Sequence, residues 1–282
     1  MIVQKSLCIF MHYSKHLYIP IYVSMYVNEL SFHFEQVILV TNYRSINKEF
    51  LSMNQNVTTL FVKNEGYDFG MFYKAFQTII PSEYSQIACI NDSNILINGL
   101  NSIFDWGKST QYDFWGIIDS HEKPWFSTHT NNYHIQSHFM VFNRKAIDKI
   151  PAFFASLSIQ EIFNENDPVK LRQAVINQWE IGLTQYLVKQ GFSCGSFIDS
   201  KLYTQLYLLG KSVNAGHKLY AELIQAGYPL MKRKIIIKKS WKDRFRQQYR
   251  WEKIIRQYGN KNWDIENLID ELKQIKKESS KT

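Results

Sequence analysis

Short apolar runs alternate with segments of helical periodicity along much of this chain. The apolar runs are rich in β-branched and aromatic residues and are bounded by turn residues, which is typical of buried strands. We expect such strands at residues 6–13, 36–41, 57–63 and 87–90. Helices are expected between them, at residues 18–30 and 71–80. Strands that alternate with helices in this way predict an α/β fold with a mainly parallel sheet covered by helices.

The alternation continues through the middle of the chain. We expect strands at residues 112–119 and 135–143 and helices at residues 100–110, 146–157 and 178–190. A polar and aromatic loop occupies residues 121–132. Because no repeat or low-complexity linker interrupts the pattern, we expect residues 1–230 to form one domain and residues 231–282 to form a basic helical tail.

The net charge of +8 at pH 7 is concentrated in that tail. Residues 231–256 carry 11 Lys and Arg against two acidic residues, and aromatic residues such as Trp241 and Phe245 are interleaved with them. This pattern suits an amphipathic helix on an anionic membrane, and it also suits a helix packed on the domain. Nucleic-acid binding is a third alternative that rests on the tail alone. As macromolecular partner we expect an anionic membrane surface at residues 231–256, and no nucleic acid.

Cysteine usage and hydropathy bear on the compartment. Cys8, Cys89 and Cys194 lie far apart and show no metal-ligand spacing. A sparse, odd number of cysteines indicates a reducing compartment. No apolar run reaches the roughly 18 residues that a membrane-spanning helix needs. We therefore expect a cytoplasmic protein, held peripherally at the inner face of the plasma membrane if the tail contacts lipid.

Four polar residues interrupt the apolar run at residues 86–97. They are Asn91, Asp92, Ser93 and Asn94. A carboxylate where a buried strand ends is typical of ligand sites in α/β folds. The same residues also suit an ordinary turn, because short polar side chains hydrogen-bond their own backbone. From the pattern alone, both interpretations stand.

Other segments carry candidate chemistry with equally plain alternatives. Residues 64–70 hold two glycines and two carboxylates at a strand-to-helix junction, which suits either an anion site at a helix N-terminus or a capping loop with Asp68 as N-cap. Glu180 is expected in the first turn of a helix, as a general base or as an acid favoured by the helix dipole. His134 and His138 would share one face of a strand, which favours hydrogen bonding to a substrate or an ordinary loop role over metal binding.

Six segments, in the same order along the chain, are similar to those of one known family. They lie at residues 64–70, 91–93, 113–120, 134–142, 179–183 and 227–232. On these segments the chain resembles the bacterial rhamnan synthesis F-type proteins, a glycosyltransferase family of polysaccharide and lipopolysaccharide assembly. The resemblance covers most of the chain and implies a GT-A-like domain that binds a nucleotide sugar.

The resemblance also implies roles for individual residues. Asp92 would act in catalysis and bind a divalent cation, Mg²⁺ or Mn²⁺, that holds the diphosphate of the donor. Glu180 would be the catalytic base that deprotonates the acceptor. The nucleotide site would contain Asn64, Gly66, Asp68, Asn91 and Ser93. Contacts to the sugar or the acceptor would come from Asp119, His134, Gln136 and Trp179.

Together these roles imply a single reaction. A sugar, rhamnose or another hexose, would pass by inverting displacement from a nucleotide-sugar donor to a growing cell-surface polysaccharide, such as an O-antigen, or to a lipid-linked glycan. The alternative is a non-catalytic scaffold or binding module of polysaccharide assembly. The alternative is favoured by the strand-end motif, which has one acidic residue where Asp-x-Asp is usual.

Overall fold

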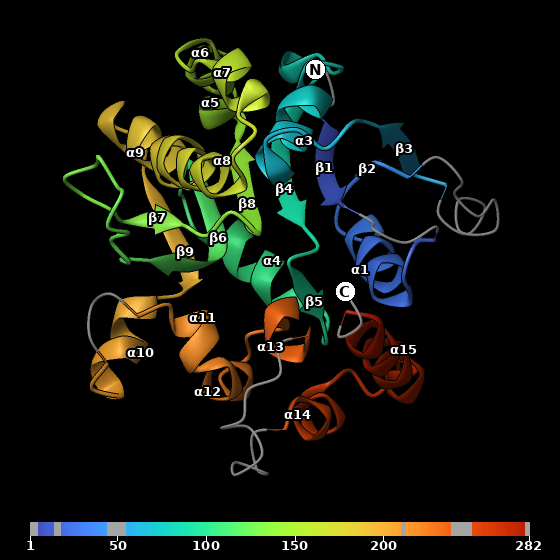
Figure 1. Cartoon of the computed structure of the whole chain (residues 1–282). Coiled ribbons are helices and arrows are strands. Elements are labelled where there is room, and N and C mark those ends of the chain that lie inside the picture. Colours follow the sequence, from blue (N-terminus) through green and yellow to red (C-terminus); the bar gives the residue numbers. More distant parts are fainter. Residues whose placement is uncertain (1–4, 14–17, 44–54, 210–212, 238–249, 280–282) are drawn as a thin grey trace.

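A central sheet with helices packed on both of its faces organises the protein (Figure 1). The computed structural model describes residues 5–13, 18–43, 55–209, 213–237 and 250–279. The strands of the sheet are β1 (Lys5–His12), β2 (Gln36–Thr41), β3 (Val57–Phe61), β4 (Tyr84–Asn91), β6 (Phe114–Ser120), β7 (His134–Ile135), β8 (Phe139–Asn143) and β9 (Cys194–Ile198). Their order is β3-β2-β1-β4-β8-β6-β7, with β9 beside β6. The predicted α/β fold with a mainly parallel sheet is confirmed.

The order of the strands defines a switch point at the centre of the sheet. Strands β1, β2, β3 and β4 run parallel, and β1 lies between β2 and β4. The chain builds outward from β1 to β3 and then returns to place β4 on the other side of β1. Ligands of open α/β sheets bind at such a reversal, outside the carboxyl ends of the strands. The fold therefore directs attention to the edge beyond His12 and Asn91.

Both faces of the sheet are buried, which explains why its strands are apolar almost throughout. In β1, Cys8 and Phe10 belong to one core cluster, whereas Ile9 and Met11 belong to the other. The first face is covered by α1 (Ile21–Ser31), α4 (Asn101–Ser109) and helices from the C-terminal region. The second face is covered by α3 (Tyr67–Phe76), α5 (Arg144–Ile147), α6 (Ile150–Ala155) and α9 (Gly182–Lys189).

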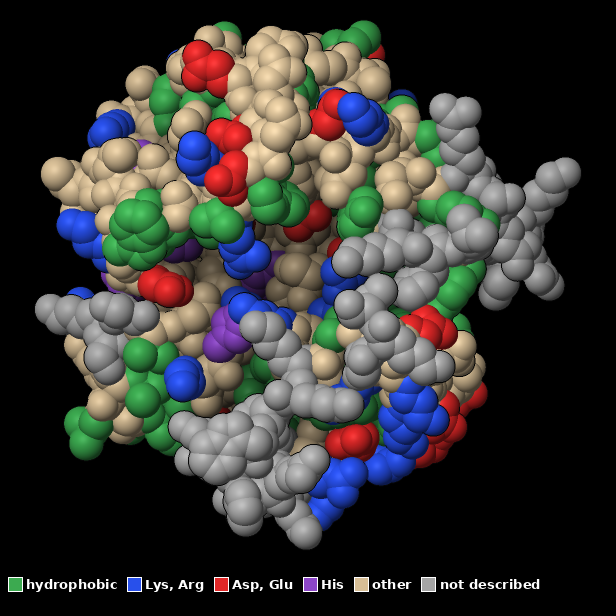
Figure 2. Space-filling view, viewed as in Figure 1, with side chains coloured by type: hydrophobic (Ala, Val, Ile, Leu, Met, Phe, Trp, Pro, Cys, Tyr) green, Lys and Arg blue, Asp and Glu red, His purple; other side chains and the backbone are tan. Residues whose placement is uncertain are grey.

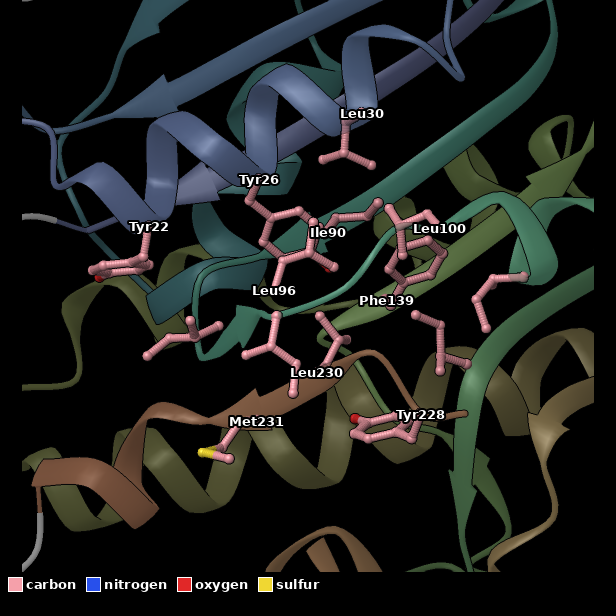
Figure 3. Close-up of a cluster of buried hydrophobic side chains, with 14 of the residues drawn as sticks. Tyr22, Tyr26, Leu30, Ile90, Leu96, Leu100, Phe139, Tyr228, Leu230 and Met231 are labelled. Atoms are coloured by element: carbon pink, nitrogen blue, oxygen red, sulfur yellow. The ribbon is translucent and has the colours of Figure 1, made fainter. Parts of the chain in front are cut away.

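The C-terminal region packs on the first face of the sheet. β10 (Leu230–Lys232) pairs antiparallel with β5 (Asn94–Leu96), and its apolar residues join the cluster that α1 covers (Figure 3). α14 (Trp251–Tyr258) and α15 (Ile265–Glu278) bury their apolar sides in the same cluster. The described part of the amphipathic stretch thus packs on the domain, and residues 238–249 lie outside the described residues. The division of the chain at residue 230 stays a prediction.

A carboxylate from α15 caps the N-terminus of α1. The residue before α1 is Pro20, which makes no side-chain capping hydrogen bond. Glu271 accepts hydrogen bonds from the backbone N–H of Ile21, at 2.6 Å, and of Tyr22, at 3.1 Å. A carboxylate in this position satisfies donors that the helix cannot pair and interacts favourably with the helix dipole. The C-terminal helix therefore stabilises a helix from the beginning of the fold.

Several element boundaries differ from those expected. The helix expected at residues 71–80 begins at Tyr67, because Gly66 adopts a left-handed backbone (φ 72°) that turns the chain into the helix early. The strand expected at residues 135–143 is two strands, β7 and β8, so His134 and His138 do not share one strand face. The helix expected at residues 146–157 is divided into α5 and α6, with a proline in the first turn of α6.

Short helices make up most of the remaining regular structure. They are the 3₁₀ helix η1 (Pro81–Glu83), α7 (Ile159–Asn164), α8 (Pro168–Ala174), α10 (Ser200–Leu206), α11 (Ala215–Lys218), α12 (Tyr220–Gln225) and α13 (Arg233–Ile237). Within the described ranges, no helix combines the length and the apolar character that crossing a bilayer requires.

Candidate functional site

Asp92 lies at the switch point of the sheet, directly after β4. Its backbone N–H donates to the carbonyl of Met11 in β1 (3.2 Å), and its side chain is almost fully buried. One carboxylate oxygen, Oδ2, accepts three hydrogen bonds: from His12 Nδ1 at 2.8 Å, from the Tyr22 hydroxyl at 2.9 Å and from Arg233 Nη1 at 2.6 Å. The polar residues at 91–94 are therefore more than a surface turn, because their acid organises groups from β1, α1 and α13.

The contacts of Asp92 fix its charge. Burial alone would raise the pKa of this carboxyl, but the charge of Arg233 and the hydrogen bonds from His12 and Tyr22 hold its pKa below the ordinary value. The same pairing raises the pKa of Arg233. A buried carboxylate is stable only when it is paired and hydrogen-bonded in this way. Asp92 and Arg233 thus form a charged pair at the base of the site.

A pocket of about 910 Å³ opens beside this pair. Its lining contains five basic side chains, from Arg172, Lys218, Lys232, Arg233 and Lys234. Three acidic side chains also line it, from Asp68, Glu122 and Glu180. Figure 2 shows Lys, Arg and His side chains gathered around the hollow. A concave site with an excess of positive charge concentrates anionic ligands.

Two of the acidic groups in the pocket have raised pKa values. Burial raises the pKa of Glu180, against the effects of a hydrogen bond from Ser137 and of the charge of Lys232. Burial, reinforced by the charges of Asp92 and Glu180, raises the pKa of Asp68 to about 7. Carboxyl groups with raised pKa values are suited to proton transfer near neutral pH. Asp68 lies in the first turn of α3 and does not cap the helix, whose N-cap is Gly66.

Glu180 lies in a π-helical segment and not in the first turn of a helix as expected. The π-helix (Val175–Ile181) continues directly from α8 and leads into α9. π-Helical turns are rare and are frequent at functional sites. Asn177 anchors the segment to the loop at residues 121–132, since its backbone carbonyl accepts from His129 Nε2 at 2.8 Å and its side chain accepts from the N–H of Thr128 at 3.0 Å.

Burial away from water lowers the pKa values of both Lys232 and His138. Desolvation lowers the pKa of Lys232 to about 8, against the opposing effect of Glu180. Lys232 Nζ donates to Asn214 Oδ1 at 3.2 Å. Burial lowers the pKa of His138 to about 3, so the ring is neutral, and its Nε2 lies 2.9 Å from the hydroxyl of Tyr228. Of these two residues, Lys232 can present charge to a ligand.

Six of the predicted site residues line the pocket together. They are Asp68, Asn91, Ser93, His134, Gln136 and Glu180. Asp92 lies behind them and meets the pocket through Arg233. These residues come from the end of β4 and the turn after it, the start of α3, β7 and the turn after it, and the π-helix, so the fold brings together segments that are far apart in sequence.

The other predicted site residues lie elsewhere. Trp179 is fully buried and packs edge-on against Phe69, so its side chain does not line the pocket. Gly66 is buried beneath the same indole, and a Cβ atom there would lie 3.3 Å from the Trp179 ring. Asp119 is also buried, and its carboxylate accepts from the backbone N–H of Ser200 at 2.8 Å.

Asn64 lines a second pocket of about 410 Å³. This pocket lies where β1, β2 and β3 end, and Tyr13 and Asn42 also line it. It therefore occupies the same sheet edge as Asp92, on the other side of the switch point.

Within the part of the chain that the structure describes, one side-chain group is compatible with a divalent cation. Asp119, His121 and Asp199 each offer a ligand atom, and these atoms lie within 4.8 Å of one another. Imidazole and carboxylate ligands suit several transition metals. At Asp92 the donor set is different, because the neighbouring positions are Asn91 and Ser93 and the carboxylate is already paired with Arg233.

The structure adds residues that the sequence reasoning did not select. His12, Tyr22 and Arg233 hold Asp92, and Lys232 lines the pocket. A signal for the last two existed in the sequence, since both stand at the start of the basic segment beginning at residue 231. The sequence predicts a tail there because no local pattern indicates that β10 pairs with β5.

The fold and the pocket define an α/β protein with a mixed-charge, predominantly basic site at the switch point of its sheet. The chain belongs to the rhamnan synthesis protein F family, whose sequence model matches residues 37–279. The predicted resemblance to this family is thereby confirmed.

Individual relatives are more distant. The chain is 24% identical over 202 residues to the virulence protein VirA of Vibrio anguillarum, both in strain ATCC 68554 / 775 and in a second sequence from that species. The match includes 62% of this chain, which spans about 60% of the length of these curated relatives.

Two solved structures show limited likeness to the fold. One is a putative glucose-1-phosphate thymidylyltransferase from Bacillus anthracis in complex with a sucrose, with 10% identity, a TM-score of 0.42, and coverage of 69% of this chain and 86% of that chain. The other is a 4-diphosphocytidyl-2C-methyl-D-erythritol synthase from Anaerococcus prevotii DSM 20548, with 10% identity, a TM-score of 0.41, and coverage of 70% and 89%.

Proposed function

We propose that this protein is a glycosyltransferase with a GT-A-like domain. It transfers a sugar, rhamnose or another hexose, from a nucleotide-sugar donor to a growing cell-surface polysaccharide or a lipid-linked glycan. The observation that carries the proposal is the pocket itself, in which a carboxyl group of raised pKa, Glu180, lies close enough to the cationic Lys232 for each to shift the pKa of the other. Family membership supports the assignment to polysaccharide synthesis.

The proposed reaction is a single displacement. Glu180 accepts the proton of an acceptor hydroxyl, and the resulting oxygen forms a bond to the anomeric carbon of the donor. The bond between that carbon and the diphosphate oxygen breaks, and its electron pair leaves with the nucleoside diphosphate. The anomeric configuration is therefore inverted. Ser137 and the π-helix keep Glu180 in position for this step.

The donor extends along the sheet edge from one pocket to the other. Its diphosphate lies near Asn91, Ser93 and Asp92, and its nucleoside enters the smaller pocket that Asn64 lines. His134 and Gln136 provide hydrogen bonds to the sugar or the acceptor. The binding of Mg²⁺ or Mn²⁺ by Asp92 stays a prediction.

The acceptor enters across the loop at residues 121–132. Trp125 in this loop is 86% exposed, and its neighbours Pro124 and Phe126 line the pocket. An exposed indole offers a rigid apolar surface with a polar N–H, which suits the apolar face of a sugar ring. Since the loop is hydrogen-bonded to the π-helix at Asn177, Trp125 is tied to the segment that carries Glu180.

Calorimetry against a panel of nucleotide sugars tests the proposal. The panel contains dTDP-, UDP- and GDP-linked sugars, each measured with and without Mn²⁺. We expect one donor to bind and to release its nucleotide when an acceptor glycan is added. Donor binding without release in the presence of any acceptor favours a binding module of polysaccharide assembly, and no binding of any donor contradicts the proposal.

A further inference from the structure

We propose that Lys232 and Arg233 bind the diphosphate of the donor and stabilise it as the leaving group, in the place where a divalent cation would otherwise do so. This inference rests on the proposed transferase function and adds the residues that neutralise the leaving charge. These two cations lie at the junction of β10 and α13, beside the strand-end motif.

The strand-end motif does not offer a cation site of the usual composition. Its single acid, Asp92, already has a cationic partner, because Arg233 Nη1 lies 2.6 Å from Oδ2. His12 and Tyr22 donate to the same oxygen. A metal ion at Asp92 Oδ2 would have to compete with a guanidinium that the buried carboxylate needs for its own stability.

The neighbours of Asp92 are engaged in holding the turn. Asn91 Oδ1 accepts from the backbone N–H of Ser93 at 3.0 Å, and Asn91 Nδ2 donates to the carbonyl of Ser137 at 3.5 Å. Divalent cations such as Mg²⁺ in nucleotide sites are bound through one or two carboxylates together with the phosphates. Here neither neighbour of Asp92 is a carboxylate: the amide oxygen of Asn91 already accepts a hydrogen bond, whereas the buried Oδ1 of Asn94, two residues beyond Asp92, accepts none.

The two cations are fixed to the same turn as Asp92. Lys232 is paired with Asn94 in the antiparallel ladder between β10 and β5. The backbone N–H of Arg233 donates to the carbonyl of Ser93 at 3.0 Å. Both basic side chains are therefore positioned by backbone hydrogen bonds to the residues that follow Asp92. Preorganised charges of this kind stabilise a developing anion without a cost of reorganisation.

Arg233 can bind both Asp92 and a phosphate. Its contacts to Asp92 and to the hydroxyl of Tyr22 both use Nη1, whereas a guanidinium carries five N–H donors. Its side chain is 30% exposed in the pocket, while that of Asp92 is 3% exposed. Arginine binds phosphate oxygens through paired, parallel hydrogen bonds. Asp92 thus acts as the anchor of the cation and not as a ligand of the phosphate.

The step remains balanced without a metal ion. When the bond between the anomeric carbon and the diphosphate oxygen breaks, the oxygen retains the electron pair and gains negative charge. Lys232 and Arg233 then donate hydrogen bonds to the diphosphate, while the proton from the acceptor stays on Glu180. No reductant, oxidant or further reactant is required.

Titration of the free nucleoside diphosphates tests this inference. Calorimetry is performed on the full chain with UDP, GDP, dTDP and ADP, first in EDTA and then with Mn²⁺. We expect at least one of them to bind in EDTA, with an affinity that Mn²⁺ changes by less than about tenfold. We expect Lys232→Met to weaken that binding about tenfold or more in both conditions, because a charged hydrogen bond is lost.

The arginine is tested with two variants, since Arg233 pairs with a buried carboxylate. Arg233→Gln removes the charge, and Arg233→Lys keeps the charge but loses the paired geometry; thermal unfolding establishes that each is folded. We expect the wild type to bind the nucleotide most tightly, Arg233→Lys to bind it more weakly, and Arg233→Gln to bind it most weakly. Lys189→Met is the matched control, because Lys189 is exposed at the end of α9 and should bind as wild type does.

The outcomes separate the two proposals. Binding that occurs only with Mn²⁺, or wild-type affinity in folded Lys232→Met and Arg233→Lys, overturns the role of the two cations and leaves the transferase function standing. Failure of every nucleotide and nucleotide sugar to bind in either condition overturns the transferase function itself.

Discussion

At the scale of single residues, Glu180 and Asp68 both present carboxyl groups of raised pKa to one pocket, but from different elements. Glu180 is held by Ser137 and lies close to Lys232, whereas Asp68 is close to Asp92 and Arg233. Asp68 therefore lies on the Arg233 side of the pocket, and Glu180 lies on the Lys232 side. Glu180 is nearer to the loop through which we expect the acceptor to enter, so the two acids divide between acceptor and donor.

Replacing the proposed base tests this division. Glu180→Gln should lower the rate of sugar transfer about 10²- to 10⁴-fold, because the amide cannot accept the proton of the acceptor. Donor affinity measured by calorimetry should stay close to that of the wild type. Glu161→Gln, on the exposed side of α7, is the control and should be fully active. A folded Glu180→Gln protein with wild-type transfer would assign the base elsewhere.

The raised pKa of Asp68 predicts how the stability of the folded protein depends on pH. An acid whose folded pKa of about 7 exceeds its unfolded value binds its proton more tightly in the folded state. Its stabilising contribution is present below the unfolded pKa and is lost as the pH rises through 7. Asp68→Asn resembles the protonated form, so we expect its melting temperature to exceed that of the wild type by about 3 °C at pH 8.

The same measurement at a lower pH is the control. At about pH 5 the folded Asp68 is protonated while the unfolded Asp68 is still largely ionised, so the difference in melting temperature should be smaller than at pH 8, and it should disappear below the unfolded pKa of about 4. An equal difference at both pH values would mean that the substitution acts through packing and not through the charge of Asp68.

At the scale of elements, the sequence predicted the regular strands well and the backbone exceptions poorly. β2 has the expected bounds at residues 36–41 because its β-branched run is local information. The early start of α3 depends on the left-handed Gly66, and the π-helix depends on contacts to a distant loop through Asn177. Asp92 is recognisable in the sequence because it follows a buried strand, whereas the basic character of Arg233 does not reveal its partner, which is 141 residues away.

The junction between α15 and α1 supplies a prediction at this scale. Glu271→Ala should lower the free energy of unfolding by about 1–2 kcal/mol, because two backbone donors of α1 lose their acceptor. Glu271→Gln keeps one acceptor oxygen and should cost less. Chemical denaturation of both variants measures the difference. Equal stability of Glu271→Ala and wild type would show that water replaces the cap without loss.

At the scale of the whole molecule, the basic residues of the C-terminal region lie in two separate locations. Lys232, Arg233 and Lys234 line the pocket, whereas Arg256 pairs with Glu266 on the surface between α14 and α15. The basic residues of the segment 231–256 therefore do not form a single continuous charged surface. Contact with an anionic membrane rests on the basic residues that neither of these arrangements uses.

A vesicle-binding measurement tests that contact. Replacing Lys238, Lys239 and Lys242 by Gln should weaken binding to vesicles that contain anionic lipid by about a hundredfold, because each basic residue near such a surface contributes about 1 kcal/mol. The control replaces Lys145, Lys149 and Lys170 by Gln. These exposed lysines lie in or next to α5, α6 and α8, so the control removes the same charge from another part of the surface. Equal binding by the two triple variants would exclude a specific membrane segment.

The positions of the three donors to Asp92 along the chain determine when the site can form during synthesis. His12 and Tyr22 are synthesised before Asp92, but Arg233 follows it by 141 residues. Contacts of such long separation form late in folding, because the chain between them must first be ordered. On the ribosome, the acid at the centre of the site therefore lacks its cation until β10 has emerged and paired with β5. We expect nascent chains that stop before residue 230 to remain dependent on chaperones.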